Sequence, residues 1–360
     1  MSDRKGFDPL HLRERITRRV STAAALRSAT RGAKRLIAFL TPGCDAPAGG
    51  VLSIAALYRE TKTMGDIHRA RVALCPVPGD PYIAKYTWFE NRDYMLDLNA
   101  VLGRCGRLDY LLLHVPEYAC GQVAGWLDTE AGKRAREAGE LHLNVLVQNI
   151  DLLAVEDLRR LEGFGRVTCT TNHDSYSGAD TRERLGVTMH KLSVGIYRQE
   201  FFRRADYKDK EPILVVSHDE HPLKERVLGR LARELPGLKI QVVRGISYEE
   251  YKRLIRRAKW ALTFGEGLDG YFVESVFSGG LPFAVYNERF FTPDFEGLEN
   301  IYDSWEALEE GMAADMRRLD EPSGYKNAWR RVYGLLDEIY DTERFRENLR
   351  TFYRGEYTFP

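Results

Sequence analysis

From residue 35 onward, short apolar runs alternate with longer segments in which apolar residues recur every three to four positions. The runs predict buried parallel strands, and the periodic segments predict helices that cover both faces of a sheet. The predicted strands are 35–40, 71–75, 110–114, 143–148 and 166–170, then 213–217, 239–243, 260–263 and 283–285. The predicted helices are 51–62, 122–138, 223–235, 248–257 and 271–278. Because the alternation occurs twice, it predicts two doubly wound α/β domains.

A charged segment over residues 203–212 separates the two series. Few of its residues suit a hydrophobic core, and a chain of 360 residues is long for a single core. We therefore predict a first domain over 36–204 and a second over 205–324. The aromatic, helical segment 325–360 is expected to cross back to the first domain.

The N-terminal segment 1–35 differs from the rest, because its ten basic and three acidic residues give a net charge of +7. Its apolar residues repeat at helical spacing, at Leu12, Ile16 and Val20, then at Ala23, Ala24 and Leu26. This pattern predicts a basic amphipathic helix. Packing on the protein body, contact with an anionic membrane surface, and nucleic-acid binding all remain open for this helix.

Composition narrows the class of protein. Lysine plus arginine and aspartate plus glutamate both number 53, so the net charge is zero and binding of nucleic acid over the whole surface is excluded. No apolar run approaches the roughly 20 residues that span a bilayer, and the first 30 residues lack the apolar stretch of a signal peptide. We expect a cytoplasmic protein, with the inner membrane face as a further expected location.

The strongest chemical pattern lies between the strands 260–263 and 283–285. Glu266 follows the first of these strands, and Glu274 lies in the next helix. The loop between them contains Gly265, Gly267 and Gly270, which let a backbone approach a ligand closely. Free N–H groups at the helix start favour a pyrophosphate, whereas carboxylates accept hydrogen bonds from sugar and ribose hydroxyls. The pattern therefore favours a ligand that carries both a pyrophosphate and sugar hydroxyl groups.

The spacing Glu266-x7-Glu274, followed by Gly-Gly-Leu-Pro at 279–282, resembles the Glu-x7-Glu signature of the large retaining glycosyltransferase family of GT-B fold. That family includes bacterial enzymes that build surface polysaccharides and glycolipids. The segment 243–258 also resembles the stretch that precedes the signature, and the similarity extends over 213–285. The resemblance implies two Rossmann-like domains facing a cleft, a nucleoside-diphosphate-sugar donor, a glycan or lipid-linked acceptor, and no metal or other cofactor.

The resemblance also implies roles for particular residues. Glu266 would contact hydroxyls of the donor sugar, Glu274 would bind the ribose hydroxyls, and Lys224 would neutralise the diphosphate. The residues implied in donor binding besides these are Gly245, Ile246, Gly267, Leu268, Asp269, Gly270 and Tyr271.

The chain departs from the family pattern at two places. The family has an arginine shortly before the lysine, whereas this chain has Ser217, His218 and Asp219 there, so His218 or His221 is expected to substitute. The loop after the first glutamate contains Asp269 instead of the usual Gly-Phe-Gly.

The first half offers weaker candidates. Gly49 and Gly50 open a predicted helix and resemble the family's first-domain glycine loop, with an ordinary tight turn as the alternative. His114 is predicted at the exit of its strand, where the resemblance implies a histidine near the transferred sugar, with a structural histidine as the alternative. Polar residues at later strand exits are candidates for facing the acceptor: Asn149, Asp151, Asn172, His173 and Asp174.

Retaining sugar transfer is therefore the predicted function, with roles in catalysis for Glu266, His114 and Lys224. The spacing His218-x-x-His221 has no third ligand of recognisable spacing, so we predict no metal site there. A glycosidase acid/base pair is disfavoured because Glu274 follows a phosphate-type loop. Two alternatives remain open: a nucleotide-sugar epimerase of the same fold, and a non-catalytic scaffold.

Overall fold

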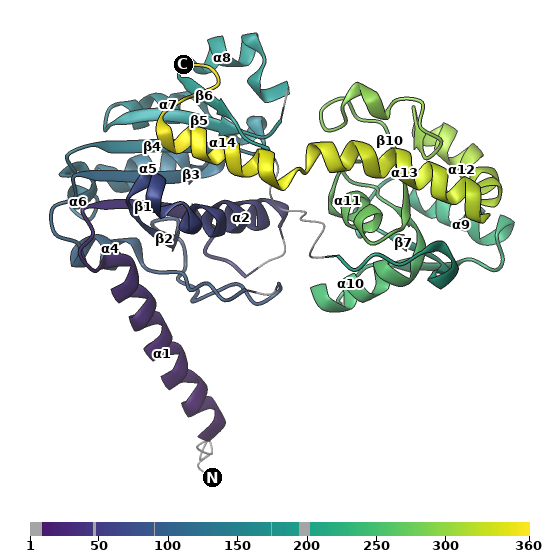
Figure 1. The fold of residues 1–360 in the computed structure, drawn as a ribbon, viewed down its shortest axis with the longest axis horizontal. Helices are drawn as coiled ribbons and strands as arrows, with labels where there is room; N and C mark the ends of the chain where they lie inside the picture. The colour runs from purple at the N-terminus through teal and green to yellow at the C-terminus, as the bar shows by residue number, and fades with distance from the viewer. Residues whose placement is uncertain (1–8, 46–47, 90, 174, 194–201) are drawn as a thin grey trace. The chain divides into compact units, whose positions relative to one another are not determined.

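A computed structural model describes residues 9–45, 48–89, 91–173, 175–193 and 202–360, with only the backbone described for 9–19 and 175. The chain forms two compact units (Figure 1). The first unit contains Met1–Leu192 and Arg346–Pro360, and the second contains Ser193–Phe345. These boundaries differ from those expected from the sequence, which predicts a second domain over 205–324.

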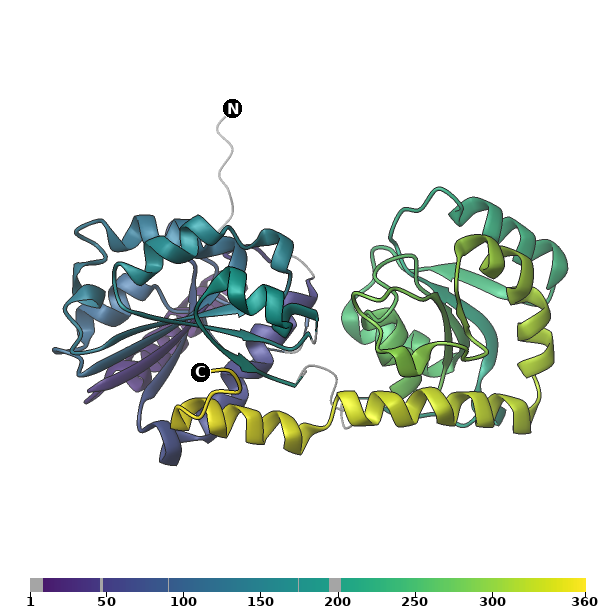
Figure 2. The same cartoon turned by 90° about the horizontal axis from the view of Figure 1, so that it is seen from above.

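The first unit is built on a parallel sheet of six strands in the order β2-β1-β3-β4-β5-β6. Its strands are β1 (Arg35–Thr41), β2 (Arg71–Pro76), β3 (Tyr110–Pro116), β4 (Leu141–Val147), β5 (Arg166–Thr171) and β6 (Thr188–Lys191). The central strands are almost completely buried because helices cover both faces of the sheet (Figure 2). Doubly wound packing of this kind accounts for the continuous apolar runs in the sequence.

The helices of the first unit are α1 (Pro9–Thr30), α2 (Gly49–Thr63), α3 (Gly65–His68), α4 (Leu98–Arg104), α5 (Cys120–Leu127), α6 (Lys133–Arg136), α7 (Val155–Glu162) and α8 (Ala179–Leu185). The single helix predicted over 122–138 is wrong, because α5 and α6 are separated by a turn. Gly132 lies in this turn, where its Cα is packed against the backbone of Trp126 and Leu127. A side chain at this position would clash with that backbone.

Among the residues of α1 whose side chains the structure describes, those at the C-terminal end pack on the first unit. Ala29 is buried, and Leu26 contacts the hydrophobic core, but Val20 is 61% exposed and Ala24 is exposed as well. Val20 and Ala24 therefore belong to the predicted apolar stripe but do not lie on the buried face of the helix. The side chains of Leu12 and Ile16 lie outside the described residues. In the part of the chain that the structure describes, no helix has the length and hydropathy to cross a membrane.

The second unit contains a parallel sheet of five strands in the order β11-β10-β9-β7-β8. Its strands are β7 (Glu211–Val216), β8 (Lys239–Val242), β9 (Ala258–Leu262), β10 (Leu281–Val285) and β11 (Ile301–Tyr302). Its helices are α9 (Lys224–Glu234), α10 (Tyr248–Arg257), α11 (Gly270–Phe277), α12 (Trp305–Leu319) and α13 (Pro322–Ile339). Each predicted strand and helix of this half corresponds to one of these elements.

The C-terminal segment serves both units. Tyr325 and Val332 on α13 belong to the core of the second unit. The last helix, α14 (Thr342–Arg354), contributes the buried Leu349 and Phe352 after the chain has entered the first unit at Arg346. The return to the first unit therefore begins about one helix later than the position 325 expected from the sequence.

Candidate functional site

The loop between β9 and α11 carries Glu266, and Asp269 organises this loop. Asp269 is the N-cap residue of α11: its Oδ1 accepts a hydrogen bond from the Phe272 N–H at 3.1 Å, and its Oδ2 accepts one from the Thr263 hydroxyl. These two bonds join the end of β9 to the start of the helix. Gly267 has a φ of 91° and lies directly against the Phe291 ring, so this position requires glycine.

Three carboxyl groups converge around this loop. A Cβ added at Gly265 would lie 3.0 Å from Asp269 Oδ2 and 3.1 Å from Asp219 Oδ2. Desolvation and the nearby Asp219 raise the pKa of Glu266, although much of this side chain faces solvent. Burial, together with Asp219 and Glu266, raises the pKa of Asp269 to about 7. No described lysine or arginine forms an ion pair with any of the three.

Glu274 lies on α11 and is buried, with 3% of the residue exposed. Its Oε1 accepts a hydrogen bond from the Tyr248 hydroxyl at 2.8 Å. The Tyr251 hydroxyl is buried near the same carboxyl group but makes no hydrogen bond of normal geometry. Burial is the largest influence on Glu274 and raises its pKa to about 8 despite the phenol donors. Burial therefore favours the neutral form of this carboxyl group.

The start of α10 positions Tyr248 for this contact. Ser247 and Glu250 form a capping box, in which each side chain bonds to the other residue's backbone N–H. Gly245 precedes the helix with a φ of 65°, a left-handed conformation that favours glycine, and Ile246 is half-buried beside it. The predicted donor-binding residues Gly245 and Ile246 therefore lie in the connection that brings Tyr248 to Glu274.

Lys224 is the first residue of α9, and it holds the preceding loop in place. Its Nζ donates hydrogen bonds to the backbone oxygens of Ser217 at 2.9 Å and Asp219 at 2.6 Å, and the residue is 4% exposed. The Ser217 hydroxyl in turn accepts a bond from the Phe264 N–H, which connects this loop to the exit of β9. In this structure Lys224 therefore stabilises the loop that carries Asp219.

His218 and His221 point to different neighbours. His218 Nδ1 lies 3.1 Å from the Tyr271 hydroxyl, so the structure brings His218 to the predicted donor loop. The His221 ring packs on Trp305, with ring centroids 4.2 Å apart. Among the described residues, no group of three or more His, Cys, Asp or Glu side chains is arranged to hold a metal ion.

The predicted position of His114 is wrong. β3 extends to Pro116, so His114 lies within the strand, where it is 3% exposed and stacks on Phe39. Its Nδ1 pairs with Asn144 at 2.9 Å and its Nε2 with the Tyr353 hydroxyl at 3.2 Å. Because burial also keeps its pKa well below the ordinary value, His114 is a neutral, fully paired structural histidine.

The remaining candidates of the first unit are also involved in local contacts. Gly49 and Gly50 begin α2, and Gly50 packs against the Gln148 side chain. The Asn149 side chain caps the short turn at Asp151 by accepting its N–H. His173 packs on Tyr176, and Asn172 is half-buried. Asp174 lies outside the described residues.

Sequence reasoning did not single out three residues that the structure places at this site. Asp219 follows β7 in the same polar stretch as His218, so its position at a strand exit was an available signal. Tyr248 and Tyr251 gave no such signal. They precede Glu274 by more than twenty residues, and only the packing of α10 beside α11 joins them.

Comparisons with known proteins identify the fold. No protein-family model and no curated protein sequence matches the chain. Among solved structures, the chain is similar to HepE of Anabaena in complex with UDP-glucose, at 12% identity and a TM-score of 0.54, over 88% of this chain and 99% of that one. It is also similar to sucrose-phosphate synthase from Thermosynechococcus elongatus, at 12% identity and a TM-score of 0.53, over 89% and 98%.

A third similar structure is the DNA-modifying β-glucosyltransferase, determined with and without uridine diphosphoglucose. It has 10% identity and a TM-score of 0.51, over 89% of this chain and 99% of that one. Similarity at these identities concerns the fold. Together with the two parallel α/β units, it shows that the chain has the GT-B fold expected from the sequence.

Proposed function

Because the chain has the GT-B fold, we propose that it is a glycosyltransferase that moves a sugar from a nucleoside-diphosphate sugar to a hydroxyl acceptor, with retention of configuration. The observation that best supports the proposal is the environment of the Glu274 carboxyl group. This carboxyl group is buried, its hydrogen-bonding neighbours are phenols, the charge of Lys252 is only a minor influence, and burial raises its pKa to about 8. A vicinal diol such as ribose would supply the hydroxyl donors that a buried carboxylate requires.

The other groups of the second unit have compatible roles in this proposal. Glu266 is exposed at the loop, where it would accept hydrogen bonds from hydroxyls of the donor sugar. Amides of the loop that runs from Gly267 to Tyr271 would contact the diphosphate, with His218 beside Tyr271 as a further donor. Lys224 would act mainly by holding the Asp219 loop, because its Nζ already donates to two carbonyl groups.

Asp269 is the residue that least suits a phosphate site, because an ionised carboxylate would repel the diphosphate. Its raised pKa of about 7 reduces this cost, since the neutral acid carries no charge and can donate a hydrogen bond. Catalysis would then depend on electrostatic stabilisation of the leaving diphosphate by the loop amides, without a metal ion or other cofactor.

The acceptor is proposed to be a glycan or a lipid-linked glycan of bacterial surface polysaccharide synthesis, on the cytoplasmic side of a membrane. Support comes from the family resemblance and from the charge of +7 over residues 1–35, which would favour contact with anionic lipids. HepE is described in complex with UDP-glucose, so a uridine-diphosphate sugar is the first donor to test.

The test is a binding screen of nucleoside diphosphates and their sugars by calorimetry and thermal shift. We expect UDP-glucose or a related donor to bind and raise the unfolding temperature. Glu274→Gln should weaken this binding by about 10–100-fold, because hydrogen bonds to a charged group contribute more than those to a neutral one. Glu310→Gln, an exposed change on α12, is the matched control and should bind normally.

Binding of no nucleotide sugar to the wild-type protein would refute the proposal and favour a scaffold. Binding with turnover of the sugar in the absence of any acceptor would instead identify an epimerase. Unchanged affinity in Glu274→Gln would remove the ribose role while leaving the transferase proposal to be decided by product analysis.

A further inference from the structure

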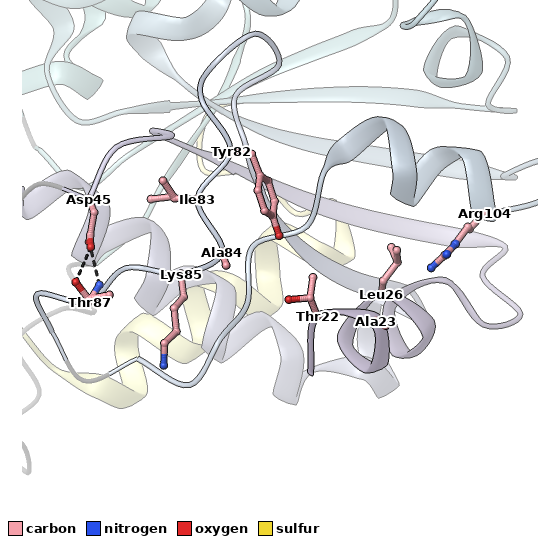
Figure 3. Close-up of a pocket in the computed structure, with 10 residues that line it drawn as sticks. All are labelled: Thr22, Ala23, Leu26, Asp45, Tyr82, Ile83, Ala84, Lys85, Thr87 and Arg104. Atoms are coloured by element: carbon pink, nitrogen blue, oxygen red, sulfur yellow. Dashed lines mark hydrogen bonds between the residues drawn. The ribbon is translucent and has the colours of Figure 1, made fainter. Parts of the chain in front are cut away.

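The first unit contains a pocket of about 550 Å³ that the proposed donor site does not use (Figure 3). Four segments line it: the C-terminal half of α1, the loop that follows β1, the loop that follows β2, and the end of α4. The residues that matter here are Ala23 and Leu26 on α1, Tyr82, Ile83 and Lys85 in the loop, and Arg104 on α4.

The loop after β2 is held firmly at the carboxyl end of the sheet. The Tyr86 hydroxyl pairs with the Thr41 hydroxyl at 2.8 Å, at the end of β1. Asp80 accepts the Gly43 N–H at 3.0 Å, and Asp45 accepts both the N–H and the hydroxyl of Thr87. In sheets of this type, ligands bind beyond the carboxyl ends of the strands. One side of the pocket is therefore at the edge where ligands of such sheets bind, and the pocket extends from there to α1 and the end of α4.

The apolar lining of the pocket remains accessible. Tyr82 donates its hydroxyl to the Met95 carbonyl within its own loop, yet the residue is 51% exposed, so its ring faces the open side. Val20 lies one turn before Ala23 on α1 and is also exposed, which extends the apolar surface beyond the pocket. Exposed apolar surface of this kind indicates a binding site for an apolar group.

Two cations accompany this apolar lining. Lys85 Nζ is 3.5 Å from the Asn91 carbonyl oxygen and 5.9 Å from the Tyr94 ring centroid, and Arg104 is exposed. Neither forms an ion pair with a carboxylate of the described residues. The one carboxylate in the lining, Asp45, is already occupied by Thr87, as Figure 3 shows. An apolar pocket beside cations that have no ion-pair partner among the described residues is complementary to an anionic amphiphile.

We propose that this pocket binds the hydrocarbon chain of an anionic membrane lipid, whose headgroup pairs with Arg104 at one end of the pocket. The excess positive charge of residues 1–35 would attract the same membrane surface. If the proposed function holds, this lipid carries the acceptor hydroxyl, and that assignment of the acceptor rests on the proposed function. The lipid-binding site itself does not depend on it.

The experiment measures sedimentation of the full chain with vesicles of phosphatidylcholine, with and without phosphatidylglycerol. Ala23→Phe fills the pocket, whereas Ala24→Phe adds the same ring to the exposed side of α1. Arg104→Glu reverses a cation of the pocket, whereas Arg134→Glu reverses an exposed cation on α6. We expect Ala23→Phe and Arg104→Glu each to weaken binding to the anionic vesicles about tenfold, and both controls to bind like the wild type.

Equal binding of Ala23→Phe and the wild type would overturn the proposal, and so would equal losses in Arg104→Glu and Arg134→Glu. Equal binding to vesicles without phosphatidylglycerol would also overturn it. Thermal unfolding of each variant checks that it is folded, and monomeric decyl phosphate should stabilise Ala24→Phe but not Ala23→Phe. UDP-glucose binding measured on the same samples tests the proposed function separately, so the two ideas can fail independently.

Discussion

The two units place polar side chains on their sheets in opposite ways. In the first unit, histidine, asparagine and threonine form a buried network beneath α14, in which each polar group has a partner. In the second unit, carboxyl groups gather at the carboxyl ends of β7 and β9 without an ion-pair partner among the described residues. The first arrangement contributes to folding, whereas the second is electrostatically costly and would be accounted for by the ligand binding that we propose.

The network of the first unit runs across three strands. Tyr110 bonds to His142 at 2.9 Å, and His142 bonds to Thr168 at 2.8 Å. Asn144 accepts from Thr168 and pairs with His114, which reaches Tyr353 on α14. His114, His142 and His190 all lie within about 6 Å of the Phe352 ring centroid. Polar residues here attach the last helix to the sheet.

The largest expected effect is that of replacing His114, which tests whether the polar network of the first unit acts in folding rather than in donor binding. His114→Ala should remove a stacked ring and two hydrogen bonds from the core, and so lower the free energy of unfolding by about 3 kcal/mol. Urea denaturation measures this loss. UDP-glucose affinity should stay within about twofold of wild type, because the proposed donor site lies in the second unit.

His114→Gln is the companion variant, because it replaces the ring with a side chain that does not titrate. Burial holds the pKa of His114 well below its ordinary value, so the unfolded chain binds a proton more readily than the folded one. Acidification below about pH 6.5 therefore destabilises the wild type, and His114→Gln should lose less stability over that range. A strong loss of donor binding in either variant would contradict the contrast between the units.

The next largest effect is the pH dependence of donor binding by the second unit. Ribose hydroxyls would donate to the Glu274 carboxylate, so binding should lower the pKa of about 8 and release a proton. The affinity for UDP-glucose should then rise with pH between pH 6 and 8, by less than tenfold per pH unit, because Asp269, whose pKa is about 7, ionises beside the diphosphate over the same range. Calorimetry in buffers of different ionisation enthalpy measures both the affinity and the released proton.

UDP-glucose suits this measurement because its diphosphate is esterified at both ends and keeps a constant charge over the range. Glu274→Gln should lose this rise and keep only the fall in affinity that ionisation of Asp269 beside the diphosphate produces. A wild-type profile that falls as steeply as that of Glu274→Gln would contradict the ribose role of Glu274.

The strands were largely predictable, because central parallel strands are buried on both faces and appear as apolar runs. The edge strands β6 and β11 were missed, since Thr188–Lys191 is of mixed polarity and Ile301–Tyr302 has only two residues. The break between α5 and α6 was also missed. It depends on the close backbone contact of Gly132 with Leu127, which no periodicity reveals.

The site was predictable only where local sequence determines it. Strand, glycine loop and helix placed Glu266, Asp269 and Glu274 near one another. His114 was misplaced, because whether a polar residue of a strand is buried depends on α14, more than two hundred residues away. Tyr248 was missed for the same reason, since its contact with Glu274 exists only after α10 packs beside α11. The roles of these residues in binding stay predictions.

A smaller effect tests Tyr248 directly. Its hydroxyl favours the ionised form of Glu274, so Tyr248→Phe should raise the pKa of Glu274 further and move the pH profile of UDP-glucose binding upward. At pH 7 the affinity should fall by about tenfold, and it should recover partly in more alkaline buffer. Tyr207→Phe, which removes a hydroxyl bonded to Asp320 in the same unit, should leave the profile in place.

The smallest effect concerns the helix start that presents Tyr248. Ser247→Ala removes the capping box of α10 and should cost about 1 kcal/mol of stability. Ser304→Ala removes the N-cap of α12, which accepts the Ala307 N–H at 3.1 Å and carries no proposed site residue. Both variants should lose similar stability in urea, but only Ser247→Ala should weaken UDP-glucose binding, by roughly threefold, because fraying of the first turn releases Tyr248. Equal affinity in the two variants would mean that Tyr248 is held by its packing on Tyr251 rather than by the cap.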